Sequence, residues 1–103
     1  MSSGVGMMKS GGYIGTGAEK EIPLPFNPKY VKITSKTEIA VTEITDEMAP
    51  GTGMQTVYSD GTNPASIDDL AADGITLGEG KFTVGVDANI NTADSEYVWV
   101  AFE

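Results

Sequence analysis

Residues 81–103 read KFTVGVDANINTADSEYVWVAFE, and this stretch decides the fold class of the chain. In residues 82–87, apolar and polar side chains alternate, which is the pattern of a strand with one face in water. Residues 87–95 are rich in Asp, Asn and Ser, which form turns. The chain then returns as residues 97–102, where both faces are apolar. We therefore expect a terminal β-hairpin whose second strand, containing Trp99, is covered on both sides as in a sandwich.

The composition of the 103-residue chain fits one small β domain. Hydrophobic residues make up 40% of the chain, while 13 glycines and 5 prolines indicate many turns. Short strand-like runs separated by turn formers predict an all-β fold, either a small antiparallel β-sandwich or a jelly-roll-like barrel. One short helix is expected at residues 66–72, where Ser66 can cap and Asp68 and Asp69 suit the first turn.

The next strands follow from the same alternation. Ile22, Leu24 and Phe26 alternate with prolines, which predicts an extended edge segment whose three apolar side chains face the core. Residues 29–35 predict a regular strand with one apolar face. In the strand after it, Ile44 is out of phase with the preceding apolar residues, which predicts a β-bulge near Thr42 or Glu43 or an early end of the strand.

The absence of cysteine and histidine limits the chemistry open to the chain. Without cysteine, disulfides, thiol nucleophiles and zinc-thiolate sites cannot form. Without histidine, a Ser-His-Asp triad cannot form, and the commonest general base and transition-metal ligand is missing. The sequence therefore predicts a protein that is not an enzyme, with no catalytic residues, no metal and no cofactor.

The net charge of −9 is unevenly distributed. Residues 1–40 carry five lysines and three glutamates, whereas residues 41–103 carry one lysine and twelve acidic residues. All six cations are lysines, although nucleic acid is usually bound by arginine on a basic face, so no nucleic-acid partner is expected. No apolar run approaches the roughly 20 residues of a membrane span, and no signal-peptide pattern is present. We expect no membrane association and synthesis in the cytoplasm.

A calcium-type loop is one candidate site, at the start of the expected hairpin loop. Asp87, Asn89 and Asn91 match the first three oxygen positions of such a loop. Thr92 stands in place of the glycine at the sixth position, and Val98 in place of the glutamate at the twelfth. An ordinary loop rich in Asp and Asn is therefore the favoured interpretation.

Two further patterns are more simply explained by local structure. Asp68, Asp69 and Asp73 could form a carboxylate cluster, but capping of a short exposed helix accounts for them. Residues 15–17 contain Gly-x-Gly without a third glycine or a Gly-Lys-Ser/Thr, so we interpret them as a turn rather than a nucleotide-binding loop.

The aromatic residues could serve either the core or a ligand. A carbohydrate-binding platform would use the candidates Tyr13, Tyr30, Tyr58, Tyr97 and Trp99. Tyr and Trp at strand positions more often pack in a core or contact another subunit. We expect Trp99 in the core and keep carbohydrate binding as a minor alternative.

The start of the chain is expected to form a flexible N-terminal arm over residues 1–12, followed by a β-sandwich domain over residues 13–103. The arm could be a disordered tail, or it could become ordered only against another subunit. In the second case, its partner contacts would come from Val5, Met7, Met8 and Lys9. In both cases, the arm is expected to contribute little to the stability of the isolated domain.

Two groups of residues, one early and one late in the chain, together form a recognisable pattern. The groups are Gly15-Thr-Gly, Ile22-x-Leu24 and Phe26-x-Pro28-Lys29-x-Val31-x-Ile33, then Phe82-Thr-Val-Gly85, Asn91 and Tyr97-x-Trp99-x-Ala101-Phe102. The pattern resembles the small β-rich structural proteins of tailed-bacteriophage virions, in head decoration or head-fibre proteins and in tail-fibre tips. Residues 40–75 do not contribute to the match, and Pro25 stands where a glycine is expected.

The resemblance implies a non-enzymatic virion protein present in many copies. A decoration protein needs only a compact body and a capsid-contacting arm, whereas a tail fibre needs a long shaft. The resemblance therefore implies a capsid decoration (auxiliary head) protein that lies on the outer capsid surface, binds the major capsid protein and stabilises the shell. It also implies a homo-oligomer, with a trimer favoured, made in the host cytoplasm. The alternative is a receptor- or glycan-binding module of a phage tail fibre.

Overall fold

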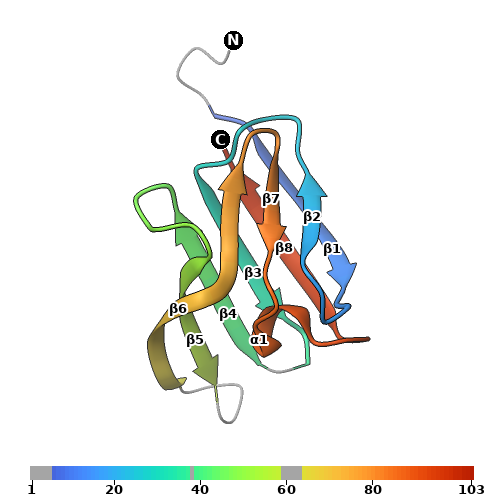
Figure 1. Ribbon diagram of the computed structural model, residues 1–103, viewed down its shortest axis with the longest axis vertical. Helices are drawn as coiled ribbons and strands as arrows, with labels where there is room; N and C mark the ends of the chain where they lie inside the picture. Colours follow the sequence, from blue (N-terminus) through green and yellow to red (C-terminus); the bar gives the residue numbers. More distant parts are fainter. Residues whose placement is uncertain (1–5, 38, 59–63) are drawn as a thin grey trace.

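The computed structural model describes residues 6–37, 39–58 and 64–103 (Figure 1). Its elements are β1 (Met8–Ile14), β2 (Lys20–Pro23), β3 (Tyr30–Ser35), β4 (Ala40–Thr45), β5 (Thr52–Tyr58), β6 (Pro64–Gly78), β7 (Lys81–Val84), α1 (Ala88–Asn91) and β8 (Glu96–Phe102). The strands form one eight-stranded sheet in the order β1-β8-β3-β4-β5-β6-β7-β2, and each neighbouring pair is antiparallel. The predicted all-β antiparallel fold with one short helix is confirmed.

The sheet curls into a half-barrel whose inner face holds the core, and β6 makes the sharpest bend. This strand pairs first with β5 and then with β7, and it loops out between Leu70 and Ile75, which pair with adjacent residues of β5. Within this bend, Asp73 has a positive φ of 62°. A Cβ atom on Gly74 would lie 2.4 Å from the carbonyl oxygen of Thr52. The bend therefore requires glycine at position 74.

The terminal hairpin expected over residues 81–103 is not formed, and this prediction was wrong. β7 lies between β6 and β2, whereas β8 lies between β1 and β3. The segment that joins β7 to β8 contains α1, which packs against β3 and β4 and places Ile90 in the core. Alternation identified both strands correctly, but a period of two does not reveal which strand is the partner.

The helix expected over residues 66–72 is also in the wrong place, because these residues belong to β6. Pairing with β5 sets Asp68 opposite Gln55 and Asp69 opposite Met54, so the ladder overrides the local capping pattern. The actual helix, α1, lies in the segment interpreted as a hairpin loop. Asp87 is its N-cap and accepts a hydrogen bond from the backbone nitrogen of Asn89.

The core follows the predicted alternation in the edge segment and in β3. Ile22, Leu24 and Phe26 are buried, as expected, and project from β2 and the residues after it. Val31 and Ile33 of β3 are fully buried. The other core residues are Tyr13, Ile44, Ile75, Phe82, Val84, Ile90, Tyr97, Trp99 and Ala101.

The bulge predicted in the next strand is absent, because β4 pairs with β3 in an unbroken register from residue 41 to residue 45. Ala40, Thr42 and Ile44 face the core, and Ile39 lies before the strand with a positive φ of 53°. A polar residue, Thr42, occupies the core face between Ala40 and Ile44, which explains the apparent shift in the apolar pattern. In the structure Thr42 is fully buried, and its hydroxyl accepts a hydrogen bond from Gln55 Nε2 at 3.1 Å.

Trp99 lies in the core, as predicted, and its ring contacts both β7 and β1. Its ring meets Phe82 edge-on at a centroid distance of 5.2 Å. On the other side the ring lies against β1, where a Cβ atom on Gly11 would be 2.9 Å from Trp99 Cζ2. The glycine at this edge-strand position therefore makes room for the indole, which in turn covers the bare backbone.

Most of the described residues of the flexible arm expected over residues 1–12 form a strand. Residues 8–12 belong to β1 and pair with β8 in continuous register, from Met8 opposite Phe102 onward. The ladder continues by one more residue, since the backbone nitrogen of Glu103 donates to the carbonyl oxygen of Met7 at 2.8 Å. Glycine-rich composition favoured a flexible segment, but the ladder to β8 and the Trp99 ring hold these residues in place.

Replacement of Trp99 by alanine tests its role in the core. We expect Trp99→Ala to lower the free energy of unfolding by roughly 3–5 kcal/mol, measured by denaturant unfolding, because it leaves a cavity beside Phe82. The matched control is Val98→Thr on the exposed face of the same strand, with an expected change within about 0.5 kcal/mol. Unchanged stability of Trp99→Ala, with loss of sugar binding, would instead support a carbohydrate site.

Deletion of residues 2–12 tests whether β1 is part of the fold. We expect a loss of about 1 kcal/mol for each backbone hydrogen bond to β8 that disappears, and a further loss from exposure of Trp99. The control is the double substitution Met8→Ser and Lys9→Ser, which removes side chains and keeps the ladder. A melting temperature equal to that of the full chain after the deletion would show that β1 contributes nothing.

Candidate partner-binding face

The face of β8 that points away from the core carries exposed apolar side chains. Val98 and Phe102 are 43% and 42% exposed, and Val100 between them is partly exposed. The prediction that β8 is covered on both faces is therefore wrong for the single chain. A strand covered by a second layer and a strand whose outer face meets a partner have the same sequence pattern, because both carry apolar residues on two faces.

The neighbouring strands extend this apolar surface. On β1, Met8 and Ile14 are 59% and 51% exposed, and Met8 lies opposite Phe102 in the ladder. On β3, the Tyr30 ring packs against Phe102 at a centroid distance of 5.8 Å. We call the surface of these three strands the outer apolar face. Its members are Met8, Ile14, Tyr30, Val98, Val100 and Phe102.

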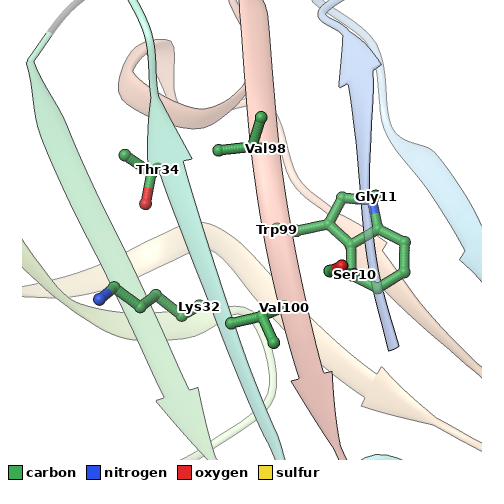
Figure 2. Close-up of a pocket in the computed structure, with 7 residues that line it drawn as sticks. All are labelled: Ser10, Gly11, Lys32, Thr34, Val98, Trp99 and Val100. Atoms are coloured by element: carbon green, nitrogen blue, oxygen red, sulfur yellow. The ribbon is translucent and has the colours of Figure 1, made fainter. Parts of the chain in front are cut away.

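A shallow groove of about 430 Å³ runs along the outer apolar face over β8 (Figure 2). Val98 and Val100 lie in it, with Lys32 and Thr34 of β3 on one side and Ser10 of β1 on the other. Because the side chain of Ser10 is small, the groove is shallow on the β1 side. Figure 2 shows the Trp99 ring reaching from β8 toward β1, away from the two valines.

Charged groups border the outer apolar face on the β3 side. The Tyr30 hydroxyl donates a hydrogen bond to the Glu43 carboxylate. Burial raises the pKa of Tyr30, and the bond to Glu43 raises it further. At the other end of β8, Lys36 and Glu96 form an exposed ion pair at 3.0 Å. An exposed pair of this kind contributes little to stability.

The predicted contact residues of the arm lie beside this face or outside the described residues. Val5 lies outside the described residues. Met7, Met8 and Lys9 are exposed, and Met8 is a member of the outer apolar face. Composition alone indicated Met8 as a contact residue, whereas the apolar pattern of Val98, Val100 and Phe102 indicated a buried strand and so gave no sign of an exposed surface.

The residues of the calcium-type pattern form a hydrogen-bond network inside the half-barrel. Asp87 Oδ2 accepts from the backbone nitrogen of Asn89 at 3.1 Å and from Gln55 Nε2 at 2.9 Å. Asn89 Nδ2 donates to Gln55 Oε1 at 3.0 Å. Within the described ranges, no group of three or more acidic residues is arranged to hold a metal ion. The network fixes α1 to β5.

Asn91 acts as a buried connector, a role that sequence reasoning did not identify. Its Nδ2 donates to the carbonyl oxygens of Ala18 at 2.6 Å and Gly85 at 2.8 Å. Its Oδ1 accepts from the backbone nitrogen of Thr16 at 2.8 Å. One side chain thus satisfies three backbone groups where regular ladders end. The residues predicted as a turn, 15–17, lie in the connection from β1 to β2, which bends at Gly17 and Ala18, and Asn91 holds this connection in place.

Two tyrosines hold the same end of the core. The Tyr13 and Tyr97 rings stack at a centroid distance of 5.1 Å. The Tyr13 hydroxyl donates to the carbonyl oxygen of Ile90 at 2.6 Å, and the Tyr97 hydroxyl accepts from the backbone nitrogen of Thr92 at 2.8 Å. Burial raises the pKa of Tyr13, and the neighbouring Tyr97 adds to this effect.

These positions do not bring the aromatic residues together as a carbohydrate platform. Tyr13, Tyr97 and Trp99 are buried, so their ring faces are not accessible for stacking on a sugar. Tyr30 is the platform candidate that lies on the outer apolar face, beside Phe102.

The aspartates of the expected cluster lie on β6. Asp68 and Asp69 occupy successive strand positions and therefore point to opposite faces, while Asp73 lies in the bend. All three side chains are exposed, and strand alternation separates the first two. The structure therefore does not form a paired-carboxylate site from them.

No protein-family model, curated protein or solved structure matches this chain. Across the described residues, no helix has the length and apolar character needed to cross a membrane.

The buried tyrosine predicts a loss of stability in alkali. The pKa of Tyr13 is higher in the folded chain than its ordinary value of about 10, so its contribution is complete below pH about 10 and falls as the pH rises further. We expect Tyr13→Phe to lower stability by about 1 kcal/mol at neutral pH, through loss of the bond to Ile90. Above pH about 10, denaturant unfolding should show a shallower decline for Tyr13→Phe than for the native chain. Equal slopes would contradict this role.

Proposed function

We propose that this chain is a capsid decoration protein of a tailed bacteriophage, which binds the outer capsid surface and stabilises the shell. The outer apolar face is the observation that carries the proposal. A small domain rarely exposes neighbouring apolar side chains on three strands unless that surface meets a partner. The resemblance of the early and late residue groups to virion proteins supports the major capsid protein as that partner.

The position of β1 supports the same surface. Met8 lies within the outer apolar face, and Met7 and Lys9 flank it at the end of the sheet where β1 begins and β8 ends (Figure 1). The start of β1 and the apolar strand β8 therefore present one contact surface. Methionine adapts its shape to a partner surface, which suits this position.

The proposed mechanism is mass action. A protein that binds assembled shell and has no affinity for free capsid subunits lowers the free energy of the assembled state. Each bound copy that spans neighbouring subunits adds to this stabilisation, and no chemical step is required. A homotrimer on the shell is the arrangement that the resemblance implies. The alternative is a receptor- or glycan-binding role in a tail fibre.

Substitution on the outer apolar face tests the proposed function. Val98→Lys places a charge on this face and should sharply reduce co-sedimentation with purified empty capsids that lack the protein, because the contact would bury the charge. The matched control is Ile67→Lys on β6, a position that is 63% exposed and lies outside the face, and it should bind as the native chain does. Both variants should keep the native melting temperature within a few degrees.

Three outcomes are informative. Reduced occupancy and reduced heat resistance of capsids with Val98→Lys alone would support the proposal. Equal occupancy by Val98→Lys and the native chain would place attachment elsewhere. If the native chain ignores capsids but binds host cells or glycans, the tail-fibre role is correct and the decoration role is wrong.

A further inference from the structure

The two edges of the sheet differ in how they are protected. β2, at one edge, is four residues long, contains Pro23 and is followed by Pro25, which prevent a further strand from pairing there. β1, at the other edge, is seven residues long and contains no proline. Its residues are exposed except for Tyr13. Among the described residues, β1 has β8 as its single strand neighbour, so its second edge is open.

The open edge of β1 presents the backbone groups of alternate residues. The backbone hydrogen bonds of Met7 with Glu103 and of Gly15 with Ser95 show that Met7 and Gly15 direct their backbone groups toward β8. Because an antiparallel strand alternates and the register is continuous, the odd-numbered residues between them do the same. The even-numbered residues therefore direct N–H and C=O groups toward the open edge. They are Met8, Ser10, Gly12 and Ile14.

We propose that two copies of this chain pair through their β1 edges, antiparallel and about a two-fold axis at Gly11. In this register, Ser10 of each copy lies opposite Gly12 of the other, and Met8 lies opposite Ile14. In each of these pairs, the backbone N–H of each residue donates a hydrogen bond to the C=O of the other. The open edge of β1 is thus complementary to itself, with every outward-directed backbone group in the strand used.

The side chains of β1 agree with this pairing. Met8 and Ile14, which are the two large apolar side chains exposed on β1, meet across the axis on the outer face of the joined sheet. Gly11 faces its own copy at the axis, where the two backbones are closest and the absence of a side chain removes any clash. Lys9 lies opposite Tyr13, so the two lysines do not face each other.

Charge also favours β1 as the contact between copies. A chain of net charge −9 repels its own copies, and β1 contains no acidic residue. Pairing there keeps the acidic residues of the two bodies away from the contact. Because the pairing is two-fold, it predicts a dimer of the isolated protein, whereas the resemblance implies a trimer. The dimer does not depend on the proposed capsid role.

The mass of the native chain in solution, measured by sedimentation equilibrium over a concentration series, tests the pairing. We expect the mass of two chains at high concentration. Ser10→Pro removes an outward-directed N–H and keeps the bonds to β8, so it should remain monomeric, while the control Ser10→Ala should dimerise. Hydrogen exchange should slow with concentration at the amides of Met8, Ser10, Gly12 and Ile14, but not at those of the odd-numbered residues.

A charge exchange tests the register even if the proline variant fails to fold. Positions 8 and 14 lie about 20 Å apart in one strand, too far for an ion pair within one copy. Met8→Lys combined with Ile14→Lys should therefore abolish the dimer, because like charges meet across the axis. Met8→Lys combined with Ile14→Glu should restore it, and added salt should weaken the restored dimer.

Several results would overturn the pairing. They are a native chain that stays monomeric at its highest soluble concentration, a trimer that Ser10→Pro leaves intact, or equal association of the two charge variants. Capsid binding is measured separately, so a dimer that ignores capsids would refute the proposed function and leave the pairing standing.

Discussion

The structure depends on the insertion of β8 between β1 and β3. This strand pairs with β1 along its full length and with β3 from Tyr97 to Phe102, so the last strand of the chain closes a sheet that begins with the first. The Trp99 ring reinforces the closure, since it packs on Phe82 inside the core and covers Gly11 on β1. Folding therefore requires contacts between residues nearly a whole chain apart, which is a slow, non-local route compared with the formation of a terminal hairpin.

The segment that connects β7 to β8 takes the place of the expected hairpin. Backbone N–H and C=O groups near this segment lie outside the strand ladders and need other hydrogen-bond partners. Asn91, Tyr13 and Tyr97 provide these partners through side-chain hydrogen bonds to the backbone. Across the described part of the chain, no buried side-chain nitrogen or oxygen lacks a partner. The polar residues of the calcium-type pattern have a structural role, because Asp87 Oδ2, Asn89 Nδ2 and the Asn91 amide are hydrogen-bonded to other side chains and to the backbone.

Local pattern predicted the strands better than it predicted their partners. The alternation around Ile22 and Ile33 was sufficient because it reports which side chains face the core. The helix expected near Asp68 failed because capping residues also occur in a strand whose ladder is set by tertiary pairing. The partner-binding surface was missed for a related reason, because the apolar pattern of Val98 and Phe102 indicated a buried strand. A sequence records that a face is apolar, but it does not record whether this chain or another one covers that face.

The open edge and the outer apolar face combine in one geometric consequence. A two-fold axis that pairs like faces in one antiparallel ladder stands perpendicular to the sheet, so the outer apolar faces of both copies point the same way. The groove over β8 would then occur twice on one side of the dimer, with Met8 and Ile14 between the two grooves. A repetitive partner could engage both copies together, and the second contact would form at a high effective concentration. A moderate affinity of each face would therefore suffice for firm attachment to a surface built from repeated subunits.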